Sequence, residues 1–137
     1  MKKEDILILG AGCAGTLLAH FLQTFGYTGR IVLIDSRTDF KREQRWCSWA
    51  KLPASFEAIV QNSWKNWRVE DENSSFICAS DEFSYQEIYA PAFYSFFHSQ
   101  LLKKSNVRFF PGERVLGITD DEKAVEVRTD RETWQAA

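Results

Sequence analysis

The sequence predicts an α/β fold with a parallel β-sheet, and this prediction rests on three features near the start of the chain. Residues 6–9 and 31–34 are uninterrupted apolar runs, a pattern typical of parallel strands that are buried on both faces. Between them, Leu17, Phe21 and Phe25 recur at four-residue spacing, which predicts an amphipathic helix. Together the three segments have the length of a strand–helix–strand unit.

The first run is joined to the helix by a glycine-rich turn. Its six residues are Gly10, Ala11, Gly12, Cys13, Ala14 and Gly15. Gly10 permits the tight turn, Gly12 lets the backbone approach a pyrophosphate, and Gly15 lets the helix pack against the strand. A glycine turn without a ligand is the alternative. The matching strands and helix around the turn favour a Rossmann-like unit that binds a dinucleotide, with all six residues at the cofactor.

Asp35 ends the second apolar run, where its carboxylate can accept hydrogen bonds from both hydroxyls of an adenosine ribose. A 2′-phosphate would be repelled there. The neighbouring Ser36, and Val115 at the start of a later strand, are also assigned to the cofactor. This local pattern suits FAD and NAD equally. The aromatic-rich stretch between residue 36 and the next parallel strand is typical of two-domain flavoproteins, which favours FAD.

Residues 36–90 are predicted to begin a β-rich excursion that forms the substrate-binding side of the protein. After this excursion the chain is predicted to return to the first sheet. Residues 36–56 show no clear period and are mostly polar, and we interpret them as a long excursion over the surface of the first domain. Residues 63–80 predict a hairpin, and Pro91 begins a second helix. Residues 107–110, 115–118 and 124–129 predict strands. We expect residues 6–9, 31–34 and 107–110 to share one parallel sheet, with residues 6–9 as its central strand.

Composition excludes several classes of function. The net charge of −2 and the lack of a basic stretch argue against nucleic acid as a partner. The sequence contains no apolar run of membrane-spanning length, and its start is not that of a signal peptide. Three cysteines, an odd number, indicate free thiols in the cytoplasm. No cluster of residues predicts a metal site. Asp81, Glu82 and Glu87 are expected to be solvated, so no catalytic residue is assigned.

The segment from Glu43 to Val69 resembles the lycopene cyclase family, whose members carry an Asn-Asp-Arg-Thr-Trp-Cys-Phe-Trp-like motif after the first FAD-binding unit. Trp46, Cys47 and Trp49 fit this motif. Gln44 stands where the family pattern has arginine, and the adjacent Arg45 could take its place. By this resemblance, Arg45 and Trp46 are assigned to the cofactor.

The resemblance implies an N-terminal portion, residues 1–137, of a FAD-binding flavoprotein domain that is C-terminally incomplete. Such a protein would cyclise the ends of a linear carotenoid, an apolar polyene, without net redox change. It would use reduced FAD, with NAD(P)H as the electron source, and contact the membrane peripherally through further segments. Trp46 and Trp49 stand out as aromatic residues outside the core. Two alternatives remain open: a piece of another FAD-dependent enzyme (a hydroxylase or an isoprenoid reductase), or a non-catalytic dinucleotide-binding module.

Overall fold

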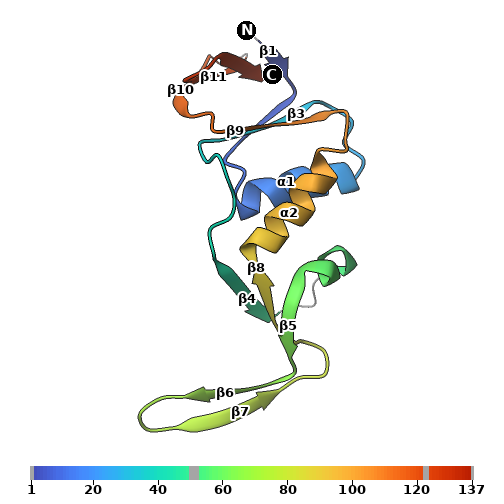
Figure 1. Ribbon diagram of the computed structural model, residues 1–137, viewed down its shortest axis with the longest axis vertical. Coiled ribbons are helices and arrows are strands. Elements are labelled where there is room, and N and C mark those ends of the chain that lie inside the picture. Colours follow the sequence, from blue (N-terminus) through green and yellow to red (C-terminus); the bar gives the residue numbers. More distant parts are fainter. Residues whose placement is uncertain (1, 50–52, 122–123, 137) are drawn as a thin grey trace. The chain divides into compact units, whose positions relative to one another are not determined.

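The computed structural model describes residues 2–49, 53–121 and 124–136 (Figure 1). The chain divides into two compact units, one formed by Met1–Phe40 with Tyr94–Ala137 and the other by Lys41–Phe93. Helix α2 (Ala90–Leu101) continues from the second unit into the first. The first unit contains the glycine-rich turn, and the second contains four of the five tryptophans.

The first unit is built on a three-stranded parallel sheet. Its strands are β2 (Ile6–Leu9), β3 (Ile31–Asp35) and β9 (Val107–Pro111), in the order β2-β3-β9. Both pairings are parallel, so the expectation of one parallel sheet from these segments is confirmed.

The expectation that residues 6–9 form the central strand is wrong, because β3 lies between β2 and β9. The reason is the direction of the connections. Helix α1 (Cys13–Thr24) and the end of α2 both contribute to the cluster on one face of the sheet. Two right-handed crossovers with their helices on the same face advance the sheet in the same direction, so β9 is added beyond β3.

Strand β3 is buried along its whole length, and its side chains alternate between two hydrophobic clusters. Ile31 and Leu33 lie with Ala19 of α1 and Leu101 of α2 on the helical face. Val32 and Ile34 lie on the other face in a cluster with Val127 and Trp134. The parallel sheet is therefore covered by helices on one face and by a second sheet on the other, which explains the uninterrupted apolar run in the sequence.

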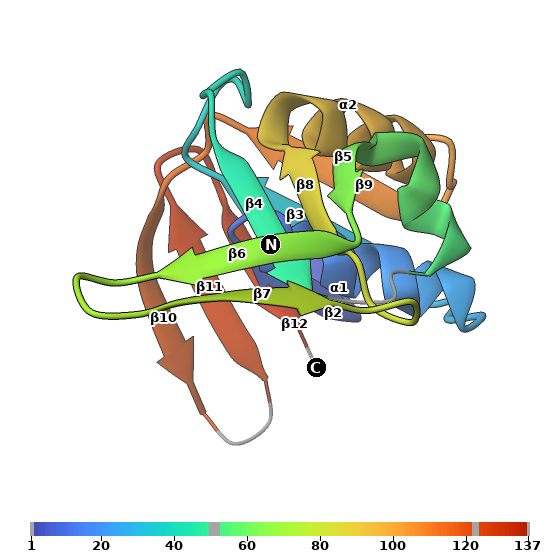
Figure 2. The same ribbon diagram turned by 90° about the horizontal axis from the view of Figure 1, so that it is seen from below.

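The second sheet consists of four strands in the order β1-β12-β11-β10, of which Figure 2 labels β12, β11 and β10. The strands are β1 (Lys2–Glu4), β10 (Val115–Asp120), β11 (Val125–Thr129) and β12 (Thr133–Ala136). Strands β10 and β11 were expected from the sequence and pair antiparallel with each other, whereas β1 and β12 were not expected. They are short and pair in parallel with each other from opposite ends of the chain, a contact without a local sequence signal.

The second unit is mainly antiparallel. It contains β4 (Arg45–Trp49), the 3₁₀ helix η1 (Ala54–Ile59), β5 (Val60–Trp64), β6 (Asn66–Glu70), β7 (Ser75–Ala79) and β8 (Tyr85–Tyr89). One sheet has the order β4-β8-β5, and β6 and β7 form the expected hairpin. At the turn of this hairpin, Asp71 Oδ1 accepts hydrogen bonds from the backbone N–H groups of Asn73 and Ser74, both at 2.8 Å.

Residues 36–56 show no clear period in the sequence, yet they include β4, which pairs with β8, and the start of η1. One expectation for this unit is wrong. Glu87 is not a solvated loop residue but lies in β8 and is only 8% exposed. It accepts a hydrogen bond from Asn62 Nδ2 at 2.6 Å and forms an ion pair with Arg45. These contacts, led by that from Asn62, hold the pKa of Glu87 below its ordinary value. The partners come from neighbouring strands, which the local sequence does not reveal.

We predict that Gly15→Ala destabilises the protein through the packing of α1 against β2. A Cβ atom at Gly15 would lie 2.0 Å from the carbonyl oxygen of Gly10 and 3.0 Å from Ile8 Cγ2. Relieving such a clash in a packed interior costs about 1–3 kcal/mol. Urea unfolding followed by circular dichroism should therefore show a lower midpoint. Gly12→Ala is the matched control, because its Cβ would meet only Arg37 Nη2, at 3.7 Å. Equal midpoints for both variants would contradict the prediction.

Candidate nucleotide-binding site

The glycine-rich turn leads from the end of β2 directly into α1. Gly10 has a φ of +101°, a conformation that favours glycine, and its N–H donates to the carbonyl of Ile34 at 2.7 Å. Gly12 is the N-cap of α1, where no side chain caps the first turn and no acidic residue lies in it. Backbone N–H groups at the start of this 12-residue helix, together with its dipole, suit an anion.

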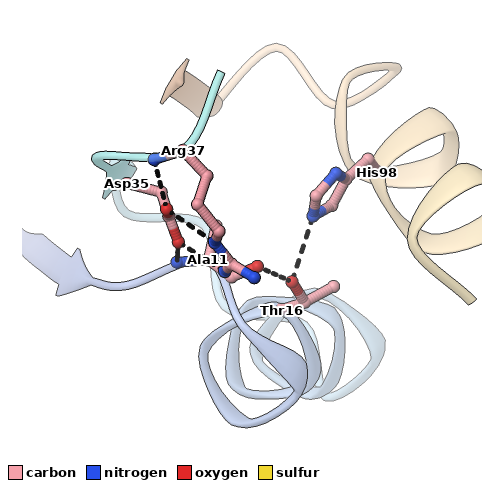
Figure 3. A network of polar contacts seen from close by, with 5 residues as sticks. All are labelled: Ala11, Thr16, Asp35, Arg37 and His98. Atoms are coloured by element: carbon pink, nitrogen blue, oxygen red, sulfur yellow. Dashed lines mark hydrogen bonds and ion pairs between the residues drawn. The ribbon is translucent and has the colours of Figure 1, made fainter. Parts of the chain in front are cut away.

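The Asp35 carboxylate joins the end of β3 to this turn (Figure 3). Its Oδ2 accepts hydrogen bonds from the Ala11 N–H at 2.8 Å and from Arg37 Nη2 at 2.7 Å. Its Oδ1 accepts from the backbone N–H of Arg37 at 2.8 Å and from Arg37 Nε at 2.9 Å. Burial acts to raise the pKa of Asp35, but these hydrogen bonds and the Arg37 charge outweigh it and hold the pKa below its ordinary value. The carboxylate is therefore ionised at neutral pH.

Thr16 and His98 support the turn from the helical side (Figure 3). Thr16 Oγ1 donates to the carbonyl oxygen of Ala11 at 3.0 Å and lies 3.1 Å from His98 Nε2. Because the hydroxyl proton is used on Ala11, Nε2 carries the proton and donates to Thr16. The His98 ring packs edge-on against Phe40 and lies near Tyr94. Burial, followed by the charge of Arg37, lowers the pKa of His98 to about 4.

An open pocket of about 480 Å³ lies at the edge of the parallel sheet where the strands end. Residues that contribute to its wall include Gly10, Asp35, Ser36, Arg37, Glu113 and Val115. In open α/β sheets, ligands bind outside the carboxyl ends of the strands, so the position of this pocket suits a ligand.

Glu113 holds in place the part of the pocket wall that includes Val115. Its N–H donates to the carbonyl of Asp35 at 3.0 Å. Its side chain is 1% exposed, and Oε1 accepts from Thr129 Oγ1 at 2.6 Å and from Trp134 Nε1 at 2.8 Å. The start of β10, including Val115, is thereby held beside the end of β3.

The sequence-based assignments fall into three groups. Four of the assigned residues line the pocket, namely Gly10, Asp35, Ser36 and Val115. The remaining residues of the turn are Ala11, Gly12, Cys13, Ala14 and Gly15, which lie at or beside the start of α1. Arg45 and Trp46 belong to the second unit, so their assignment to a cofactor stays a prediction.

Sequence reasoning did not assign four residues described here at this site, Thr16, Arg37, His98 and Glu113. Arg37 follows Asp35 by two positions, so its ion pair could have been anticipated from local spacing. Thr16 and His98 are separated by 82 positions and belong to different helices, so no local signal links them.

The second unit carries an aromatic surface. Trp46 packs edge-on against Phe93, with their ring centroids 5.0 Å apart, and is half-buried. Trp49 is 58% exposed and lies with its ring centroid 4.7 Å from that of Tyr85. Trp49 also lines an open hollow of about 430 Å³ together with Trp67 and Phe83. Aromatic side chains of this kind offer an apolar contact surface with π-faces that attract positive charge.

Within residues 2–49, 53–121 and 124–136, no group of three or more His, Cys, Asp or Glu side chains is arranged to hold a metal ion. Over the same part of the chain, neither helix combines the length and the apolar character needed to cross a membrane.

The fold is that of FAD-dependent enzymes, as the solved structures that resemble it show. The p-nitrophenol 4-monooxygenase of Pseudomonas putida DLL-E4 superposes with a TM-score of 0.76 at 15% identity, over 99% of this chain and 40% of that chain. PqsL, a probable FAD-dependent monooxygenase of Pseudomonas aeruginosa, gives a TM-score of 0.75 at 15% identity, over 98% of this chain and 41% of that chain. This chain therefore spans about two-fifths of the length of these structures.

The family is defined more narrowly by sequence. The model of the family "Lycopene cyclase protein" matches residues 5–136, and the chain belongs to this family. A terpredoxin reductase of a Pseudomonas species is 46% identical over 37 residues, which make up 27% of this chain and 9% of that protein.

We predict that His98 makes the stability of the protein depend on pH. Its folded-state pKa of about 4 lies below the ordinary value of 6.5, so the unfolded chain binds the proton more readily. His98 therefore does not lower the free energy of unfolding above pH 6.5. Below this pH, the free energy of unfolding falls as the pH is lowered towards 4. For a partly exposed ring the loss is about 1–2 kcal/mol.

Urea unfolding at pH 7 and at pH 4.5 would measure this difference in stability. His98→Gln keeps an N–H donor for Thr16 but does not titrate, so its two midpoints should lie closer together than those of the wild type. His20→Gln is the comparison variant: burial lowers the pKa of His20 too, but without the large shift of His98, so this variant should change the pH dependence less. An unchanged pH dependence in the His98 variant would show that this histidine is not its source.

Proposed function

We propose that this chain binds the adenosine diphosphate half of FAD. The observation that carries the proposal is the ionised Asp35 carboxylate, held by the Ala11 N–H at the edge of the same pocket as the glycine-rich turn. A ribose diol requires such an acceptor, and a pyrophosphate requires the uncapped start of α1 close by. Membership of the lycopene cyclase family supports FAD as the dinucleotide. A point mutant of the halogenase PltM, which shares the fold with a TM-score of 0.69, was solved in complex with FAD.

Each part of the turn has a role in this proposal. Backbone N–H groups of Gly12, Cys13 and Ala14 would face the pyrophosphate, the Ala11 N–H orients the Asp35 carboxylate, and Gly10 and Gly15 shape the turn. Asp35 binds the ribose, and Ser36 and Val115 border the adenosine. Arg45 and Trp46 would contact the flavin end. When bound, FAD supplies the reversible two-electron chemistry of its isoalloxazine ring.

We propose further that the chain is the FAD-binding part of an enzyme that cyclises the ends of a linear carotenoid, with reduced flavin supplied by NAD(P)H. Family membership supports this substrate class. Ring closure through a carbocation suits aromatic surroundings, since aromatic faces stabilise cationic charge and an apolar wall excludes water. The exposed Trp49 and the hollow that it shares with Trp67 and Phe83 provide such a surface. A carotenoid is stored in membranes, so the proposal includes peripheral membrane contact by a cytoplasmic protein.

Another FAD-dependent reaction is the second candidate, because the monooxygenases and a geranylgeranyl bacteriochlorophyll reductase-like protein of Thermoplasma acidophilum share the fold. The latter superposes with a TM-score of 0.64 at 15% identity, over 99% of this chain and 37% of that chain. A non-catalytic dinucleotide-binding module is the third candidate.

We predict that ADP binds to the chain and that Asp35→Ala weakens binding by about 1.5–3 kcal/mol, the scale of a charge-assisted hydrogen bond. Gly12→Val should abolish binding, because its branched side chain would occupy the space of the pyrophosphate. Isothermal titration calorimetry with ADP measures both effects. Circular dichroism controls for folding, since the space around Gly12 is open apart from Arg37. Unchanged ADP binding by Gly12→Val would contradict the phosphate role of the turn.

The cyclase proposal is tested in a chimaera. Residues 5–136 replace the corresponding segment of a lycopene cyclase, and the chimaera is expressed in cells that accumulate lycopene. We expect cyclic carotenoids, detected by chromatography, and their loss in the Gly12→Val chimaera. A soluble chimaera that binds FAD without forming cyclic product would favour another flavin-dependent reaction.

A further inference from the structure

All the hydrogen bonds that the Asp35 carboxylate can readily accept are made by the chain itself. Backbone N–H groups of Ala11 and Arg37 contribute one bond to each oxygen, at 2.8 Å. The Arg37 guanidinium contributes a second bond to each oxygen, at 2.9 Å from Nε and 2.7 Å from Nη2. A carboxylate has about four lone-pair positions, so none is left for a further donor.

The two kinds of donor differ in what they do for a ligand. The backbone N–H groups are fixed by the fold, and they orient the carboxylate whether or not a ligand is present. The guanidinium lies on a side chain that is 46% exposed and that lines the pocket, whereas the side chain of Asp35 is only 6% exposed. The guanidinium is therefore the group that can leave Asp35 towards the open side.

The guanidinium has a second contact that does not depend on Asp35. Its central carbon lies 4.4 Å from the ring centroid of Phe40 and 5.7 Å from that of Tyr94. Stacking of arginine on aromatic rings is favourable by itself. Nη2 also lies 3.7 Å from the position of a Cβ at Gly12, so the guanidinium spans the space between the ribose acceptor and the phosphate turn. The guanidinium makes these aromatic contacts while it is bonded to Asp35.

We propose that Arg37 is a gate on the ribose site: its guanidinium occupies the two positions on Asp35 that a ribose diol needs, and the nucleotide must displace it to bind. This inference rests on the proposed binding of an adenosine dinucleotide. Binding exchanges two guanidinium hydrogen bonds for two hydroxyl hydrogen bonds, and Asp35 stays oriented by its two backbone donors throughout. Arg37 thus lowers the affinity for nucleotides and makes it depend on the diol that competes for Asp35.

The test compares two ligands on three forms of the 137-residue chain. The ligands are ADP and 2′,3′-dideoxy-ADP, which carries the diphosphate but lacks the diol. The forms are the wild type, Arg37→Met and Arg37→Lys. Methionine removes the guanidinium but keeps an unbranched side chain, whereas lysine keeps the positive charge without the two-pronged contact. Thermal unfolding shows whether each variant is folded.

We expect Arg37→Met to bind ADP at least fivefold more tightly than the wild type in calorimetry, with Arg37→Lys between them. The dideoxy ligand should bind with unchanged or lower affinity, because it cannot use the vacated positions on Asp35. Equal or weaker ADP binding by Arg37→Met would overturn the gate, and so would equal tightening for both ligands. If no form binds ADP, the proposed nucleotide site is overturned and the gate with it. Wild-type ADP binding that Asp35→Ala weakens, without a response to Arg37→Met, would overturn the gate alone.

Discussion

The hydrogen bond from the Ala11 N–H to the Asp35 carboxylate is the contact on which the candidate site depends. It connects the ends of two parallel strands, and the register of β2 on β3, with Leu9 opposite Ile34, brings its two groups to the same edge of the sheet. The positive φ of Gly10 then turns the chain into α1, and Gly15 allows the helix to approach the turn. One parallel pairing thereby places a helix N-terminus beside a buried carboxylate.

A buried carboxylate must be compensated by donors, and this requirement explains much of the surrounding structure. Around Asp35, the donors are two backbone N–H groups and one guanidinium. Around Glu113, a hydroxyl and an indole N–H from the second sheet approach one oxygen. Because the N–H of Glu113 also donates to the carbonyl of Asp35, the two acidic residues connect the second sheet to the edge of the parallel sheet where the pocket lies.

The division of the chain into two units matches a division of chemistry. The first unit brings together the glycine-rich turn, Asp35 and the pocket beside them. The second unit carries Trp49 and the aromatic hollow, and its buried charge is the Glu87 carboxylate with its Arg45 and Asn62 partners. The two surfaces are thus carried by separate stretches of the chain, the first by residues 1–40 and 94–137 and the second by residues 41–93.

The sequence alone determined the elements whose signal lies within a few neighbouring residues. The apolar runs of β2 and β3, the four-residue spacing of α1, the hairpin within residues 63–80 and the glycines of the first turn all act through local geometry. Only the tertiary structure decided which strand is central, that β1 pairs with β12, that Glu87 is buried, and that Thr16 meets His98. These contacts join residues that are far apart in the chain. Burial and the positions of the hydrogen-bond partners stabilise them, and both arise only after the sheets have formed.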